Sequence, residues 1–204
     1  NFRMSLTSII LMAFLSSVTM ANSVPFIRPQ YAGPAFIYDS SNKENKGVLD
    51  PALRTLMLEL FVKMGANKEI ISTIFESYGV PLKYDDVQGL NSSLSHYKGL
   101  GGERCVGMGL KYTVSDLEKG GKLVIFLTGP EKCTDAKNDL AEELEHAKGK
   151  GIKIIGVGVG AEFRKDKEAM ELIEKLTGGD KEAQLFVNSY DDPEVMRIVE
   201  LVKH

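Results

Sequence analysis

Apolar positions along this chain occur either in short continuous runs or at helical spacing. Residues 123–127 and 152–159 are apolar throughout apart from small and single polar residues, as expected for strands of a sheet covered on both faces. Shorter runs at 35–39 and 185–187 are predicted to be further strands. Strands that alternate with helices imply right-handed crossovers, so the pattern predicts an α/β fold with a doubly wound, mostly parallel sheet.

Amphipathic helices are predicted between these strands, so that both faces of the sheet are covered. The first begins at Asp50-Pro51, because aspartate suits the N-cap and proline suits the first helical position. Residues 70–78 and 80–84 are predicted to be two strands joined by a turn short enough for an antiparallel pair. The predicted sheet therefore has six strands, one of them an antiparallel edge strand. Further helices are expected over residues 86–97, 105–117, 135–148 and 168–176, and from residue 192 onward.

Composition and the N-terminal pattern indicate a class of protein. The 204 residues are 43% hydrophobic and carry a formal net charge of −3, which argues against sequence-independent binding of nucleic acid. The apolar run that follows Met4 is too short to span a bilayer, and small residues after it suit cleavage after Ala21. We expect residues 1–21 to be a signal peptide, of which residues 1–3 could lie upstream of the start. The alternative is a buried apolar helix or an uncleaved anchor.

Secretion would place two further features in an oxidising, glycosylating compartment. Cys105 and Cys133 are the two cysteines of the chain, and outside the cell they could pair. Asn91 begins an Asn-Ser-Ser sequon within a polar stretch, so it is a candidate glycosylation site. Removal of the signal peptide would leave no membrane span.

Enzyme and cofactor chemistry find little support in the sequence. The three histidines are scattered, and no nucleophile elbow or phosphate loop follows a predicted strand. The glycines of Gly156–Gly160 have the wrong spacing and position for a dinucleotide fingerprint. We therefore expect no enzyme and no cofactor.

The order of elements over residues 34–203 resembles the von Willebrand factor type A (vWA) domain. Four segments carry this resemblance. Lys122–Thr128 and Gly151–Gly160 are similar to the family's fourth and fifth strands. Gly107–Tyr112 is similar to the helix start before the fourth strand, and Leu185–Asp192 is similar to the closing strand and last helix. The resemblance implies a Rossmann-like domain over residues 34–204, preceded by an N-terminal extension at 22–33. It also implies binding through a metal-ion-dependent adhesion site, where three loops supply Asp-x-Ser-x-Ser, a threonine and an aspartate.

Carried over position by position, the resemblance implies a degenerate metal site. Asp39 and Ser41 match the family's aspartate and first serine, and they could keep a weak site for Mg²⁺ or Ca²⁺. The second serine is replaced by Lys43, the threonine by Arg104 and the last aspartate by Gly129. Because Lys43 and Arg104 would repel a cation, we expect the protein to act without a metal.

The resemblance also brings the loops of Cys105 and Cys133 together over the same cleft. It thereby implies a disulfide that takes over the positioning role of the ion, and the alternative is two free buried thiols. Lys43, Arg104 and Lys132 could form a basic rim that receives an acidic partner, and the alternative is ordinary solvated loop charge.

Taken with the N-terminal segment, these features predict a secreted, non-enzymatic binding or extracellular matrix protein that acts through protein–protein contacts. The resemblance implies a collagen-like or other matrix protein as partner. The alternatives are an adhesion domain that keeps a cation site at Asp39 and Ser41, a purely structural matrix or fibre component, and a hydrolase on the same class of fold.

Overall fold

A computed structural model of the chain describes residues 31, 33–41, 49–65, 70–77, 79–82, 84, 86–98, 102–135 and 137–203. Within this part of the chain, six strands form one sheet in the order β3-β2-β1-β4-β5-β6. The strands are β1 (Ala35–Asp39), β2 (Ile71–Phe75), β3 (Gly79–Leu82), β4 (Lys122–Leu127), β5 (Lys153–Val159) and β6 (Gln184–Val187). Every neighbouring pair is parallel except β2 and β3. The predicted mostly parallel sheet with one antiparallel edge strand is confirmed.

Some predicted features lie outside the described residues. The predicted signal peptide at 1–21, most of the extension at 22–33, and Lys43 are among them. None of the helices in the described ranges is long and apolar enough to cross a membrane.

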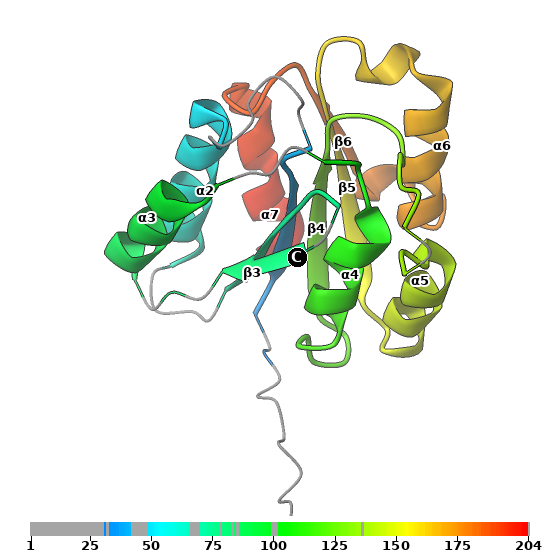
Figure 1. Ribbon diagram of the computed structural model, residues 1–204, viewed down its shortest axis with the longest axis horizontal. Coiled ribbons are helices and arrows are strands. Elements are labelled where there is room, and N and C mark those ends of the chain that lie inside the picture. Colours follow the sequence, from blue (N-terminus) through cyan, green and yellow to red (C-terminus); the bar gives the residue numbers. More distant parts are fainter. Residues whose placement is uncertain are drawn as a thin grey trace, which may run out of the picture.

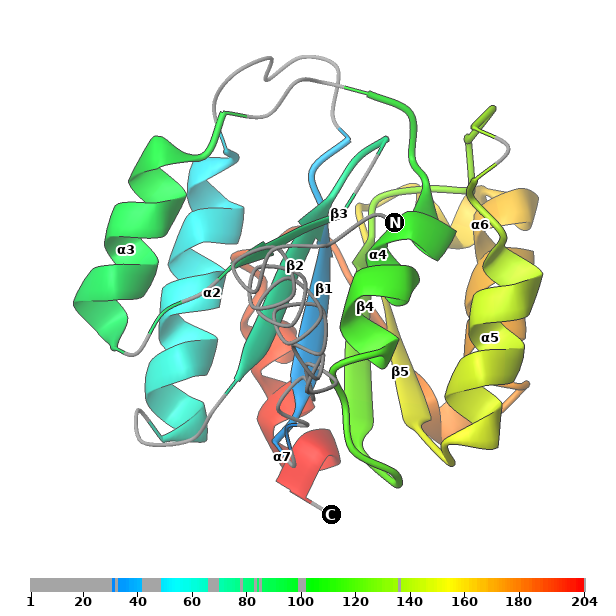
Figure 2. The same ribbon diagram turned by 60° about the horizontal axis from the view of Figure 1, so that its bottom comes forward.

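Helices cover both faces of the sheet (Figure 1). The α-helices are α2 (Pro51–Met64), α3 (Val87–His96), α4 (Val106–Val114), α5 (Leu140–Gly149), α6 (Lys167–Leu176) and α7 (Ile198–Lys203). Short 3₁₀ turns are η2 (Phe163–Lys165), η3 (Lys181–Ala183) and η4 (Pro193–Arg197). One layer holds α2, α3 and α7, and the other holds α4, α5 and α6. Figure 2 shows α4 beside α5 on one face of the sheet and α2 beside α3 on the other.

The central strand β1 contributes to both layers of the core. Phe36 and Tyr38 pack into the layer that contains α2 and α7, whereas Ala35 and Ile37 pack into the layer that contains α4. This alternation follows from the two-residue period of a strand. Successive crossovers leave β1 and β4 toward opposite faces, so Asp39 at the end of β1 stands at the switch point where open α/β sheets bind ligands.

Three helix boundaries differ from the sequence prediction. The helix predicted from residue 192 begins as the 3₁₀ turn η4, and α7 starts at Ile198. The start of α5 differs as well. The helix predicted to begin at Asp135 begins at Leu140 instead, with Asp139 as its N-cap. Asp135 caps a local turn, and the side chain of Asn138 accepts a bond from the backbone N of Met108 at 3.0 Å. This contact holds the segment before α5 against α4. Both aspartates suit an N-cap, so the local pattern could not choose between them.

The third boundary is the end of α4. The helix predicted to run to Leu117 ends at Val114. The Lys150 ammonium donates to the carbonyls of Val114, Ser115 and Leu117 at 2.7, 3.1 and 2.8 Å. A lysine near a helix C-terminus satisfies carbonyls that have no partner within the helix. This lysine belongs to the segment after α5, so the stop signal is absent from the α4 sequence itself.

Candidate functional site

A buried carboxylate lies at the carboxyl edge of the sheet. The side chain of Asp39 is 0% exposed. Its Oδ1 accepts bonds from the backbone N of Ser41 at 2.9 Å and from Ser41 Oγ at 2.6 Å. Its Oδ2 accepts from the backbone N of Thr128 at 2.8 Å and from Thr128 Oγ1 at 2.6 Å. A buried carboxylate needs such donors because they replace its bonds to water. The loops after β1 and β4 are thereby joined.

Arg104 supplies the positive charge at this edge. Its Nε lies 2.5 Å from Asp39 Oδ2, and only 13% of its side chain is exposed. Nη2 donates to Thr128 Oγ1 at 2.8 Å, and Nη1 donates to the carbonyl oxygen of Pro130 at 2.8 Å. The guanidinium therefore binds two other loops from its own position just before α4. Its planar array of N–H groups suits this kind of multiple contact.

These contacts decide whether the edge fits a divalent cation. Mg²⁺ and Ca²⁺ require several oxygen ligands, including carboxylates. Here both oxygens of Asp39 accept hydrogen bonds, and a guanidinium lies against one of them. Ser41 Oγ is itself a donor to that carboxylate. In this arrangement the described residues do not fit Mg²⁺ or Ca²⁺.

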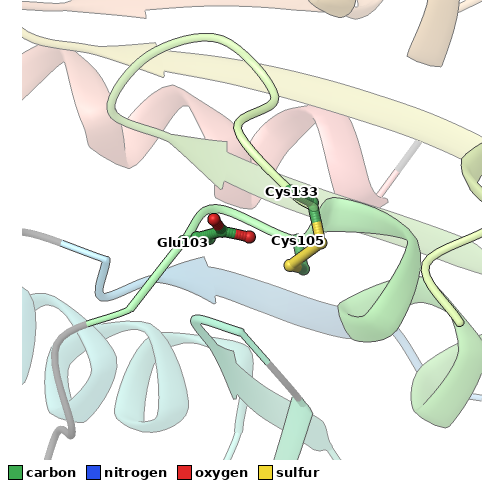
Figure 3. Close-up of side chains that lie close together, drawn as sticks. All are labelled: Glu103, Cys105 and Cys133. Carbon is green, nitrogen blue, oxygen red and sulfur yellow. A yellow bond between two sulfur atoms is a disulfide. The ribbon is translucent and has the colours of Figure 1, made fainter. Parts of the chain in front are cut away.

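A disulfide begins at the residue that follows Arg104 in the chain. Cys105 is bonded to Cys133, with a Cα–Cα distance of 4.9 Å, inside the range of ordinary bridges (Figure 3). Glu103 approaches the bridge, and one ligand atom from each of the three residues lies within 4.8 Å of the others. The two sulfurs are bonded to each other and so cannot act as thiolates, the form of cysteine that binds metals. The group is therefore a covalent clip rather than a metal centre.

Hydrogen bonds strengthen the connection that the disulfide makes. Glu103 accepts bonds from the backbone N of Thr134 at 2.6 Å and from Thr134 Oγ1 at 2.9 Å. The backbone N of Lys132 donates to the carbonyl of Arg104 at 3.0 Å. Residues 103–105 before α4 and residues 132–134 after β4 are thus joined by both covalent and hydrogen bonds.

Glu131 and Asn138 hold the N-terminus of α4, a role that the sequence analysis missed. The Glu131 carboxylate accepts from the backbone N of Val106 at 3.2 Å and from Asn138 Nδ2 at 2.5 Å. Burial raises the pKa of Glu131, while these hydrogen bonds act in the opposite direction. An acid in the loop after β4 was visible in the sequence, but its target on α4 was not.

Other predicted residues are placed as follows. Lys132 is exposed, whereas the Arg104 guanidinium points inward to Asp39 and is largely buried. A partner-binding role for Lys43, Arg104 and Lys132 stays a prediction. Arg104 turns inward because the buried Asp39 carboxylate would otherwise be left without a paired charge, and Thr128 and Pro130 accept the remaining bonds of the guanidinium. Asn91 lies exposed on α3, where its Oδ1 accepts from Arg54 Nη2 at 2.7 Å. Its glycosylation stays a prediction.

Comparisons with known proteins show which fold this is. No protein-family model and no curated protein sequence matches the chain. Among solved structures, proximal thread matrix protein 1 from the mussel byssus matches with a TM-score of 0.59 at 17% identity, over 85% of this chain and 45% of that chain. The chain therefore spans less than half the length of the mussel protein. Another structure of the mussel protein has its metal-ion-dependent adhesion site occupied by zinc.

Two bacterial structures match over almost their whole length. The vWF domain of the type V pili tip protein Mfa5 from Porphyromonas gingivalis has a TM-score of 0.59 at 9% identity, over 85% of this chain and 96% of that chain. The hypothetical protein BatB from Bacteroides thetaiotaomicron has a TM-score of 0.55 at 13% identity, over 84% and 97% of the two chains. Identities this low show the fold alone.

Proposed function

We propose that this chain, which has the fold of a von Willebrand factor type A domain, is a secreted, non-enzymatic binding or matrix protein. It acts through protein–protein contacts, with a collagen-like or other matrix protein as its partner. Two structural neighbours support this class, since one is a thread matrix protein and another is a pilus tip protein. The disulfide also suits an oxidising, extracellular setting.

The hydrogen bonds of the described hydroxyl groups support the non-enzymatic part of the proposal. His96 lies exposed at the end of α3, and His146 lies exposed on α5. The His96 ring bonds the carbonyl of Ser92, and the hydroxyl groups of Ser41 and Thr128 donate to Asp39. A hydroxyl nucleophile needs an adjacent base. The carboxylate that Ser41 and Thr128 share, Asp39, is instead paired with the Arg104 guanidinium.

The observation that carries the proposal is the ion pair between Asp39 and Arg104. A metal ion in this position would offer open coordination sites to a partner's carboxylate. The guanidinium is largely buried and neutralises Asp39, so the pair offers no comparable site. We therefore assign partner binding to exposed side chains around this edge, such as Lys132, and not to an ion.

The test is binding of the folded chain to immobilised fibrillar collagen and other matrix proteins, with Mg²⁺ and after addition of EDTA. Binding is expected to be insensitive to EDTA. Lys132→Glu is expected to weaken binding. Lys203→Glu is the charge-matched control, because α7 ends near Lys122 at the opposite, amino edge of the sheet.

Two outcomes would contradict the proposal. Binding that is lost in EDTA, restored by Mg²⁺ and abolished by Asp39→Ala would favour an adhesion domain with a cation site at Asp39 and Ser41. Retention of the full chain inside cells that secrete efficiently would contradict secretion. N-terminal sequencing of the secreted protein checks the predicted cleavage after Ala21.

A further inference from the structure

We infer that Arg104 is the resident cation of the carboxyl edge: its guanidinium takes the place of a metal ion, and Gly129 is the matching change that gives it room. The inference shares with the proposed function the statement that this edge works without a metal. It is tested by unfolding and metal titration, whereas the proposed function is tested by partner binding. The two can therefore fail separately.

The acceptors around the guanidinium are the kinds of atom that a hard cation binds. They are a carboxylate oxygen of Asp39, the hydroxyl of Thr128 and the carbonyl of Pro130. Oxygen atoms of these three classes are the usual ligands of Mg²⁺ and Ca²⁺. They come from the ends of β1 and β4, which are joined here by one group from a third segment. A cation that binds oxygen atoms of two loops and ties them to a third segment does the structural work of a bound ion.

The same guanidinium explains why the residue at position 129 has no side chain. A Cβ at this position would lie 2.9 Å from Arg104 Nη1 and 3.4 Å from its Cζ. The backbone of Gly129 is not in the left-handed region, so its own conformation does not require glycine. The end of a free arginine side chain could move aside, but this one is held by its bonds to Asp39, Thr128 and Pro130. An aspartate at 129 and an arginine at 104 therefore exclude each other.

A tethered cation has a consequence for function. A metal ion dissociates when its concentration falls or a chelator is added, whereas the Arg104 guanidinium is part of the chain and is positively charged at all physiological pH values. The Cys105–Cys133 disulfide follows directly in the same segment and restrains it further. The edge is therefore held in one arrangement whatever the supply of divalent ions.

The first experiment is a double-mutant cycle on thermal unfolding. Gly129→Ala is expected to lower the melting temperature by about 4–8 °C, because the methyl group displaces the guanidinium and breaks charge-assisted hydrogen bonds. In an Arg104→Ala background the same substitution is expected to cause no further fall. Gly149→Ala is the control, since a Cβ there meets nothing within 4 Å. Equal falls from Gly129→Ala in both backgrounds would overturn the inference.

The second experiment asks whether a metal ion can be made to replace the Arg104 guanidinium. Calorimetric titration with Mn²⁺ is expected to show no binding by the natural chain. The variant Lys43→Ser/Arg104→Thr/Gly129→Asp is expected to bind one Mn²⁺ and to lose it when Asp39→Ala is added. The inference would be overturned if the natural chain bound Mn²⁺ as well as the variant does. It would also be overturned if a variant with native circular dichroism bound no Mn²⁺. If the triple variant does not fold, the unfolding cycle decides.

Discussion

Removal of the Cys105–Cys133 disulfide is expected to destabilise the chain while leaving its fold intact. The bridge closes a loop with a sequence separation of 28 residues. Chain entropy assigns such a loop about 12 cal/mol/K, or about 3.5 kcal/mol at 25 °C, by which the crosslink raises the free energy of the unfolded chain. In the folded state the same loops stay joined by the bonds of Glu103 to Thr134. The effect therefore falls mainly on the unfolded chain.

The variant to measure is Cys105→Ala/Cys133→Ala. Alanine is preferred to serine because Cys105 is fully buried, where a hydroxyl would need its own hydrogen-bond partner. Urea unfolding followed by circular dichroism is expected to give a free energy of unfolding lower by about 3.5 kcal/mol. The melting temperature should fall by roughly 7–14 °C. Natural protein with its disulfide reduced should match the variant, and the variant should not respond to reductant.

Two results would refute this reasoning. A loss below about 1 kcal/mol would show that the crosslink restricts the unfolded chain far less than loop closure requires. A loss of the expected size accompanied by faster limited proteolysis in the loops before α4 and after β4 would show that the bridge is needed to hold the native loops. In that case the hydrogen bonds of Glu103 and Lys132 would not be sufficient to keep them together.

Three further predictions concern single side chains. Gly158→Ala should cost about 1–3 kcal/mol in urea unfolding, because its Cβ would lie 2.6–2.8 Å from two phenylalanine rings, whereas Gly149→Ala should be neutral or slightly stabilising. Burial raises the pKa of Glu131, so the folded chain holds this proton more tightly and the group's contribution to stability falls as pH rises from the unfolded through the folded pKa. Glu131→Gln should remove that component, so that the difference in melting temperature between variant and natural chain changes as the pH rises above about 4, the usual pKa of a glutamate; a constant difference would contradict it. Tyr190→Phe should cost about 0.5–1.5 kcal/mol, since the hydroxyl donates to the carbonyl of Asp39 at 3.0 Å, and an unchanged unfolding midpoint would count against that bond.

Much of the fold could be predicted from the sequence because its causes are local. The strands β4 and β5 are buried on both faces, and their apolar runs show this without knowledge of their neighbours. The Asp50-Pro51 pair marks the start of α2, where Asp50 accepts a bond from the backbone N of Ala52 at 2.8 Å. The order of elements then limited the topology through the handedness of crossovers. The element order also placed Asp39 at the carboxyl edge.

The contacts at that edge were decided by tertiary structure. The sequence indicated that Arg104 is a cation at the position where the resemblance expects a threonine, and it left a basic rim and ordinary solvated loop charge as the alternatives, without predicting an ion pair with Asp39. The structure selects the ion pair, because Asp39 and Thr128 meet only when β1 and β4 become neighbours in the sheet. Arg104 is 65 residues from its partner, and no local pattern encodes such a distance. The sequence determined which side chains stand at the edge, and the packing of the strands decided which of them bond, because a buried carboxylate must find its donors among whatever the fold brings within reach.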